Sequence, residues 1–406
     1  MKGEFNRPSV TMRNAKRPIG FFVHHQGHGH VRRASALIEL LPPRPVTVFC
    51  AEPELFEIQR PDVTVVALPD FHCQPPATRQ LLHQPNSTAL DCAPLGVNAL
   101  REGMGILAQW FREANPALVV VDVSAEVALL ARICSVPAVK IRMHGNRSDV
   151  AHEAAYSASV AMLAPFDERL EQPEYPNTFR AKTEYVGGLV GKRTPTRGRA
   201  AARDRLGLPQ DQMIIVTLSG GGGLGANIGS LTMAARAFPN ALWLLIGRVA
   251  RQGHETDFYN LQLVGWVENT MDYICAADIV VAPGGDNTVH EIAQVGRPFI
   301  CIPEWCYYAE QECKARALEC LGAAVYAPTW PADFSRWRTL VERAQACDLD
   351  VQRSLTCPNA AEHGARFLDR LADSLWEEEA HTHPLQGGPE VANRTLGEIR
   401  LMTQRT

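Results

Sequence analysis

The chain has 406 residues, of which 46% are hydrophobic and 21% are charged, and its formal net charge is -4. The length allows two α/β domains with a sizeable core, and the composition is typical of a soluble globular protein. The small net charge excludes a strong overall attraction to nucleic acid, and no apolar run is long enough to span a bilayer.

Apolar runs alternate with amphipathic segments through the first half of the chain. The pattern predicts strands at 18–24, 46–50, 63–68, 118–122, 138–141 and 160–163. It predicts helices at 33–41, 94–115, 125–134 and 149–156, with a long loop at 70–93. Strands that alternate with helices predict a parallel sheet covered on both faces.

Residues 188–200 are rich in Gly, Pro and Arg, and after them the alternating pattern starts again. It predicts strands at 213–219, 241–246, 261–264, 279–282 and 298–302. It predicts helices at 226–237, 269–276, 332–346 and 358–377. The repeated pattern predicts two Rossmann-like domains that face a cleft.

The expected domain boundaries follow from these segments. They are a flexible basic lead at 1–17, an amino-terminal Rossmann-like domain at 18–187, a linker at 188–200, a carboxyl-terminal Rossmann-like domain at 201–357, a helix at 358–377 and a loose tail at 378–406. In open α/β sheets, ligands bind at the carboxyl ends of the strands. The motifs below all lie at such positions.

The segment from Asp278 to Ile302 predicts strand, glycine turn, helix and strand in succession. Gly284 and Gly285 follow the first strand and let the backbone approach a ligand closely. The free N–H groups of the next helix attract phosphate, and Glu291, one to two turns into that helix, is placed to bind ribose hydroxyls. This unit therefore predicts a nucleotide site.

Two further segments of the second domain support that prediction. Gly220, Gly221 and Gly222 follow the strand at 213–219 and offer main-chain N–H groups for a phosphate. The glycines match neither a Walker A loop nor Gly-x-Gly-x-x-Gly, so a nicotinamide cofactor gains little support. Trp266 and Val267 follow another strand, where an aromatic ring can cover a flat base, although a half-buried tryptophan is an equally good interpretation.

Histidines gather after the first strand, in the glycine-rich turn expected at 27–33. His30 is the first candidate and His28 the second for a residue that takes a proton from a hydroxyl nucleophile, whereas His24 and His25 fit ordinary strand-end positions. A His-x-His pair can bind zinc, but no other segment supplies a third ligand, so we expect no metal site and no cofactor.

The glycine-histidine segment, the second glycine turn and the block from Trp266 to Gln311 together resemble the GT-B glycosyltransferases, and most closely glycosyltransferase family 28. That family includes the N-acetylglucosaminyltransferase that completes the lipid-linked peptidoglycan precursor. The resemblance covers roughly residues 18–375. It is strong in the carboxyl half and thin in the amino half, where only the segment at 27–33 matches well.

The resemblance implies that the amino-terminal domain at 18–187 binds the acceptor and that the carboxyl-terminal domain at 201–357 binds the nucleotide sugar. It also implies a role for each matching position. His30 would be the histidine of the cleft, and Glu291 would bind the ribose hydroxyls. The remaining positions would contact the base, the diphosphate or the donor sugar: Trp266 and Val267; Gly220, Gly221, Gly222, Gly284, Gly285 and Thr288; Glu310 and Gln311. Asp286 and Asn287 are also donor-binding candidates, although they depart from the family, because an acid beside the phosphates is unfavourable unless it faces the sugar or is neutralised.

The implied reaction is an inverting, metal-independent transfer of a sugar from a nucleotide diphosphate sugar, with uracil the favoured base, to an acceptor hydroxyl or amine. The acceptor would be a glycan, a lipid-linked molecule or a small molecule. A nucleotide-sugar hydrolase or epimerase on the same scaffold, and a non-catalytic nucleotide-sugar binding subunit, are the alternatives.

Location is predicted from cysteine usage and charge. The 11 cysteines are odd in number and form no Cys-x-x-Cys pair, which favours a reducing, cytoplasmic compartment. The first thirty-three residues carry seven Lys or Arg against a single acid, Glu4. Such a basic amino-terminal face is compatible either with a solvated start or with peripheral contact at the inner face of a membrane.

Overall fold

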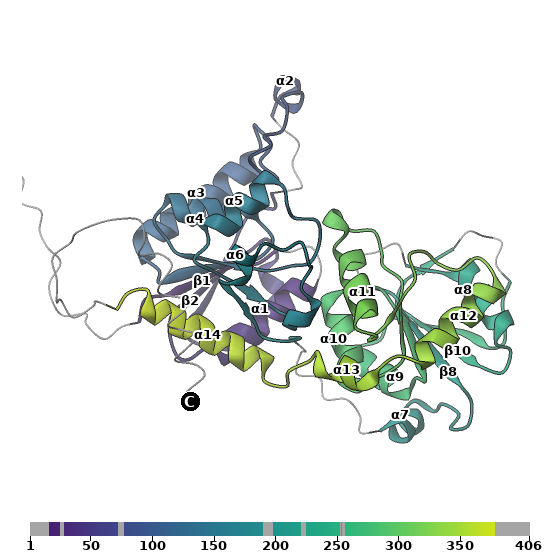
Figure 1. The fold of residues 1–406 in the computed structure, drawn as a ribbon. Coiled ribbons are helices and arrows are strands. Elements are labelled where there is room, and N and C mark those ends of the chain that lie inside the picture. Colours follow the sequence, from purple (N-terminus) through teal and green to yellow (C-terminus); the bar gives the residue numbers. More distant parts are fainter. Residues whose placement is uncertain are drawn as a thin grey trace, which may run out of the picture.

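A computed structural model describes residues 16–24, 28–71, 77–189, 198–220, 225–251, 253 and 256–377, and of His28 it describes the backbone alone. These residues form two α/β domains, each built on a parallel sheet (Figure 1). Four predicted segments lie wholly or partly outside the described residues: residues 1–15 of the expected lead (1–17), residues 190–197 of the linker, the glycines Gly221 and Gly222, and the expected tail at 378–406.

The first sheet has seven strands in the order β3-β2-β1-β4-β5-β6-β7. All of its pairings are parallel. Its strands are β1 (Ile19–Phe22), β2 (Val46–Cys50), β3 (Val63–Ala67), β4 (Leu118–Val121), β5 (Ala138–Ile141), β6 (Ala161–Ala164) and β7 (Thr183–Tyr185). Three of these strands, β1, β4 and β6, are apolar and buried along their whole length, as a sheet covered on both faces requires.

The second sheet has six strands in the order β12-β10-β8-β13-β14-β15. The same half of the chain also forms a two-stranded sheet, β11-β9. The strands are β8 (Ile214–Leu218), β9 (Ala226–Asn227), β10 (Leu242–Ile246), β11 (Val249–Ala250), β12 (Leu261–Gly265), β13 (Ile279–Ala282), β14 (Phe299–Cys301) and β15 (Val325–Tyr326). The strand order reverses between β8 and β13, as it does between β1 and β4 in the first sheet. Such switch points are where open α/β sheets bind ligands.

Helices cover both faces of each sheet, and apolar clusters fill the layers between them. In the first half of the chain they are α1 (His28–Leu40), α2 (Arg79–Leu82), α3 (Asn98–Ala114), α4 (Ala125–Ile133), α5 (Val150–Ala158) and α6 (Asn177–Arg180). In the second half they are α7 (Arg199–Leu206), α8 (Ile228–Ala237), α9 (Thr270–Ala276), α10 (Asp286–Val295), α11 (Glu310–Cys320), α12 (Phe334–Gln345), α13 (Leu349–Ser354) and α14 (Ala360–Ser374). Short 3-10 turns occur at η1 (Pro53–Leu55), η2 (Glu168–Leu170) and η3 (Tyr307–Ala309).

The last helix returns to the first domain, where α14 packs along α1 (Figure 1). Gly364 permits the close approach, because a Cβ there would lie 2.7 Å from Leu37. Arg44 fixes the helix with a 2.7 Å ion pair to Asp369, and the guanidinium side chain is 1% exposed. The carboxyl-terminal helix therefore belongs to the core of the amino-terminal domain.

One local prediction near the expected site is wrong. The sequence analysis places the histidines in a turn at 27–33, but α1 already begins at His28. Gly29 and His30 therefore lie in the first turn of a helix. The first backbone N–H groups of a helix have no partner within it, so the segment remains open to ligands although it is helical. The loop expected at 70–93 likewise contains the short helix α2.

Candidate active site

His30 and Asp122 form a close pair at the switch point of the first sheet. Nδ1 of His30 lies 2.7 Å from Oδ2 of Asp122, which directly follows β4. Nη2 of Arg33 also lies 2.9 Å from this Nδ1. The carboxylate of Asp122 can only accept, so Nδ1 carries the proton of the His30–Asp122 hydrogen bond, and in the neutral ring Nε2 then keeps its lone pair. This tautomer can take a proton from a nucleophile, and the carboxylate stabilises the imidazolium that results.

Arg33 holds the carboxylate from the other side. Its Nη2 donates to both oxygens of Asp122, at 2.8 and 3.0 Å, and the side chains of both residues are almost fully buried. Burial alone raises the pKa of Asp122, but the positive charge of Arg33 and the hydrogen bond from His30 outweigh burial and hold that pKa well below its usual range. Asp122 is therefore ionised throughout the neutral range, as the pairing with His30 needs.

Arg33 also connects the two domains. Its Nη1 donates to Oδ2 of Asp286, the first residue of α10, at 3.2 Å. The other oxygen of Asp286 accepts from the buried ammonium of Lys314 on α11. Burial raises the pKa of Asp286, but Lys314 and Arg33 together hold it below its usual range. The acid that departs from the family pattern is thus neutralised by two cations, the condition under which it is tolerated beside phosphates.

A strained turn presents Asp122 to the histidine. Val123 adopts φ 57°, a left-handed conformation that is rare for a β-branched residue. Its carbonyl oxygen accepts a 2.5 Å hydrogen bond from Nζ of Lys140 on the neighbouring strand, and Lys140 is 2% exposed. Burial, with the charge of Arg147, lowers the pKa of this lysine to about 7. Strain of this kind is commonly stored at functional sites.

The glycines after β13 have two different functions. The N–H of Gly284 donates to Oε1 of Gln311 at 3.0 Å, and a Cβ on Gly284 would lie 2.8 Å from the carbonyl oxygen of Gln311. Gly284 is therefore small because α11 packs against it. Gly285, the N-cap of α10, has nothing within 4 Å of where its Cβ would be. The open approach to the helix start is at Gly285.

Other predicted donor residues lie around the same end of the second sheet. Glu291 is nearly buried on α10, and its Oε2 accepts from the Thr270 hydroxyl at 3.2 Å. Asn287 reaches toward α1, because its amide lies 3.5 Å from where a Cβ on Gly29 would be. Trp266 follows β12 and is 68% exposed, so it is free to stack on a ligand rather than half-buried. Thr288 and Val267 are partly exposed beside these residues.

Glu310 and Tyr308 contact the first domain. Oε2 of Glu310 accepts from Arg147 at 3.2 Å, and the same guanidinium lies 4.5 Å from the centre of the Tyr308 ring. The Tyr308 hydroxyl donates to Asp91, and its carbonyl oxygen accepts from the N–H of Asn146 at 2.7 Å. Glu310 is thus engaged at the domain interface, which the sequence did not indicate.

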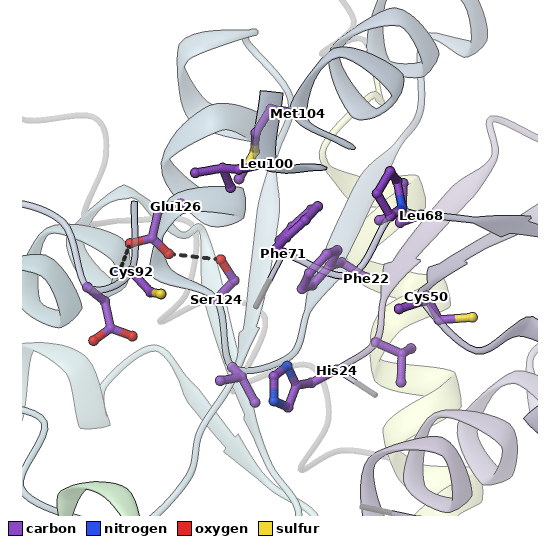
Figure 2. Close-up of a pocket in the computed structure, with 15 residues that line it drawn as sticks. Phe22, His24, Cys50, Leu68, Phe71, Cys92, Leu100, Met104, Ser124 and Glu126 are labelled. Atoms are coloured by element: carbon purple, nitrogen blue, oxygen red, sulfur yellow. Dashed lines mark hydrogen bonds between the residues drawn. The ribbon is translucent and has the colours of Figure 1, made fainter. Parts of the chain in front are cut away.

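A pocket opens beside the His30–Asp122 pair, between the carboxyl ends of β1 and β4 and helix α3 (Figure 2). Its walls are mainly apolar and aromatic: Phe22, Leu68, Phe71, Leu100 and Met104. The Phe22 and Phe71 rings are stacked, with centroids 6.1 Å apart. His24 lies at the edge of the pocket, and its ring meets that of His30 edge-on at 5.4 Å. Asp91, Ser124 and Glu126 add polar side chains to the same lining.

Sequence reasoning missed Asp122, Lys314 and the pairing role of Arg33. Asp122 had a usable signal, because it is an acid that directly follows a buried apolar strand. Lys314 had none, since it lies within a polar helix and its burial depends on the packing of α10 against α11. His28 lies near these residues in α1, but its side chain is not described, so its role stays a prediction.

The described residues contain no group of three or more His, Cys, Asp or Glu side chains that could hold a metal ion. In the same parts of the chain, no helix combines the length and apolar character that crossing a membrane requires. Of the basic amino-terminal residues, Lys16 pairs with Asp369 and Arg33 is buried in the site, whereas Arg32 is exposed. Lys16 and Arg33 therefore do not contribute to a free basic face.

Comparison with known proteins points to one class of enzyme. The glycosyltransferase family 28 C-terminal domain matches residues 234–350. The chain is 23% identical over 357 residues to the NDP-glycosyltransferase YjiC of Bacillus subtilis, spanning 80% of this chain and 88% of that protein. It is 30% identical over 157 residues to a UDP-N-acetylglucosamine–N-acetylmuramyl-(pentapeptide) pyrophosphoryl-undecaprenol N-acetylglucosamine transferase of Acetivibrio thermocellus, spanning 36% of this chain and 42% of that one.

Among solved structures, MurG of Acinetobacter baumannii superimposes with a TM-score of 0.61 at 17% identity, covering 87% of this chain and 99% of that one. A likeness at this identity shows the fold, and it confirms the predicted pair of Rossmann-like domains. The fold and the family match together define a glycosyltransferase with the GT-B architecture. Its carboxyl-terminal domain resembles that of glycosyltransferase family 28, and the enzyme uses a nucleotide-sugar donor.

Proposed function

We propose that the protein transfers a sugar, with inversion and without a metal ion, from a uridine diphosphate sugar to a hydroxyl or amine of an acceptor bound in the apolar pocket. The observation that carries this proposal is the His30–Asp122 pair, which lies beside the pocket and is joined through Arg33 to the start of α10. A base, an acceptor pocket and a helix N-terminus of the other domain thus meet in one place.

The residues of the site supply each requirement of the reaction. The acceptor oxygen attacks the anomeric carbon while Nε2 of His30 takes its proton, and Asp122 stabilises the charged ring. The bond from the anomeric carbon to the diphosphate oxygen breaks, and its electron pair stays on the diphosphate. The first N–H groups of α10 and the N–H of Gly220 are our candidates for stabilising that charge. Attack from the face opposite the leaving group inverts the anomeric centre.

The donor follows from the second domain and from the relatives. Glu291 at the helix and Trp266 at the end of β12 are our candidates for binding the ribose and the base, and Gly220, Gly285 and Thr288 for contacting the diphosphate. The Acetivibrio thermocellus relative is named for a UDP-linked sugar, which supports a uridine diphosphate donor. Glu310 and Gln311 remain candidates for the donor sugar. A peripheral position at a membrane stays a prediction.

A hydrolase or epimerase on the same scaffold is the rival reaction. Water needs no pocket walled by aromatic and aliphatic side chains, so the pocket beside His24 favours an organic acceptor. A hydrolase would release free sugar from the donor alone, whereas a transferase yields a glycoside only when an acceptor is present. A non-catalytic binding subunit would bind the donor without turning it over.

The test combines a panel of uridine diphosphate sugars with apolar hydroxyl and amine acceptors, in the presence of EDTA, and analyses products by mass spectrometry and NMR. We expect a glycoside of inverted anomeric configuration, lost in His30→Ala. His363→Ala is the matched control, because His363 pairs with Glu184 at the same distance of 2.7 Å, away from the site. Free sugar without an acceptor, retention of configuration, or activity abolished by EDTA would contradict the proposal.

A further inference from the structure

Glu304 lies between Gly220 and Gly284 in the second domain. It follows β14, and its Oε2 is 3.3 Å from where a Cβ on Gly220 would be, so the carboxylate projects over the first residue of the turn after β8. Its backbone N–H donates to Oε1 of Gln311 at 3.0 Å, and the same oxygen accepts from Gly284 at 3.0 Å. Glu304 is therefore anchored at the switch point between β8 and β13.

The other carboxylates near this switch point are already engaged. Asp286 is paired with Arg33 and Lys314, and Glu310 with Arg147. Glu304 differs, because no cation or hydrogen-bond donor among the described residues meets its half-buried carboxylate. Burial raises the pKa of this side chain. A partly desolvated carboxylate is unfavourable without partners, and a ligand rich in hydroxyl donors supplies them.

We propose that Glu304 binds hydroxyl groups of the donor sugar and selects neutral sugars over acidic ones. This inference rests on the proposed function, since it concerns the sugar of the same donor. The two oxygens of a carboxylate accept hydrogen bonds from neighbouring hydroxyls, and such charge-assisted bonds are stronger than neutral ones. A uronic acid would instead place a second negative charge beside Glu304 and the diphosphate, where burial weakens screening.

The main alternative partner for this carboxylate is a divalent cation. Magnesium is commonly held by one or two carboxylates together with substrate phosphates, so a single Glu304 beside a diphosphate is compatible with it. The structure favours the sugar, because Asp286, the neighbouring acid that could act as a second ligand, is held by Arg33 and Lys314. The experiment includes magnesium so that the two partners are distinguished.

The experiment measures binding by calorimetry, which requires no acceptor. Uridine diphosphate, UDP-glucose, UDP-galactose, UDP-N-acetylglucosamine and UDP-glucuronic acid are titrated into the wild type, Glu304→Gln and Glu304→Ala. Glu312→Gln is the matched control, because it removes the same charge from a partly exposed position on α11 where Glu312 pairs with Arg316. Each titration is repeated with EDTA and with magnesium.

The wild type should bind its best neutral donor at least tenfold more tightly than UDP-glucuronic acid. Glu304→Gln should weaken the neutral donor roughly tenfold, as loss of a charged acceptor predicts. Glu304→Gln should also reduce the ratio of the affinity for the neutral donor to that for UDP-glucuronic acid. Its affinity for uridine diphosphate should stay within threefold of the wild-type value. Glu312→Gln should match the wild type.

Unchanged sugar preference in Glu304→Gln would overturn the inference, as would an equal loss for uridine diphosphate or a magnesium requirement that disappears in the variant. A wild type that binds UDP-glucuronic acid as tightly as neutral donors would overturn it without any variant, should the variants fail to fold. If the wild type binds neither uridine diphosphate nor any of its sugars, it is the proposed function that fails.

Discussion

Replacing Asp122 with asparagine tests whether the His30–Asp122 pair is the catalytic centre. The substitution keeps the shape but removes the charge that holds the proton on Nδ1 of His30, and the amide NH₂ can donate to Nδ1 and leave the wrong tautomer. General base catalysis contributes about 10²- to 10⁴-fold, so we expect a loss of that size in kcat, or roughly 3–5 kcal/mol of barrier. KM for the donor should change little, because Asp122 contacts the histidine and Arg33 rather than the proposed donor site.

The structure also predicts the cost in stability. Breaking a buried ion pair commonly costs about 3–5 kcal/mol, because one charge is left without a partner. Arg33 keeps Asp286 at 3.2 Å after the substitution, so we expect a loss at or below the lower end, about 2–3 kcal/mol. Urea denaturation measures this loss, and coupled release of the nucleoside diphosphate measures the rate.

Glu184→Gln is the matched control, since Glu184 meets His363 at the same 2.7 Å in a pair remote from the site. It should leave kcat within twofold of the wild type. The double variant of His30→Ala and Asp122→Asn should be no slower than the slower single variant, because the two side chains act as one unit. An Asp122→Asn enzyme that is folded and retains at least a third of the wild-type rate would refute this assignment.

Three further predictions concern the same network and its surroundings. Folding lowers the pKa values of Asp122 and Asp286, so their contribution to stability is present above the ordinary pKa near 3.8 and is lost as pH falls through the lower folded values. The urea midpoint of unfolding should therefore fall between pH 4 and pH 2. It should fall less steeply in Asp286→Asn, which has one of these two carboxylates fewer. Glu291→Ala should raise the donor KM about tenfold with kcat nearly unchanged, measured by initial rates, and an unchanged KM would remove Glu291 from the ribose site. Gly188→Ala should lower the free energy of unfolding by about 1–3 kcal/mol, because the new Cβ would lie 2.2 Å from Nδ1 of the buried His290. Gly105→Ala is the contrasting variant: it lies in α3 with nothing within 4 Å of the new Cβ, so it should raise the free energy of unfolding by roughly 0.5–1 kcal/mol.

The central strands and the helix that carries Glu291 were predictable, because each of those strands is a short apolar run. The edge strands β7 and β15 were not predicted, because each has only two or three residues. The pairing of His30 with Asp122 was not. These residues are 92 positions apart, and they meet because β4 pairs with β1 instead of following β3 across the sheet, with Phe22 opposite Val121. An alternating sequence pattern predicts which segments are strands but not the order of the strands in the sheet. It therefore could not predict that the two side chains meet.

In the second domain, too, the sequence could not predict which side chains contact each other, although there the residues are closer together in the chain. Gly284 and Gln311 were both predicted to contact the ligand, yet the N–H of one donates to the side chain of the other. A glycine that permits close packing of α11 and a glycine that admits a phosphate look identical in sequence. Similarly, Asp286 looks unfavourable beside phosphates until the packing of α11 brings Lys314 to it.

The central claim is that the second domain binds a nucleoside diphosphate at the carboxyl ends of β8 and β13. The most direct measurement is a crystal structure of the protein with saturating uridine diphosphate. We expect the diphosphate at Gly285 and the start of α10, the ribose on Glu291 and the uracil against Trp266. Uridine diphosphate bound only in the pocket of the first domain, or at another surface, would contradict the account.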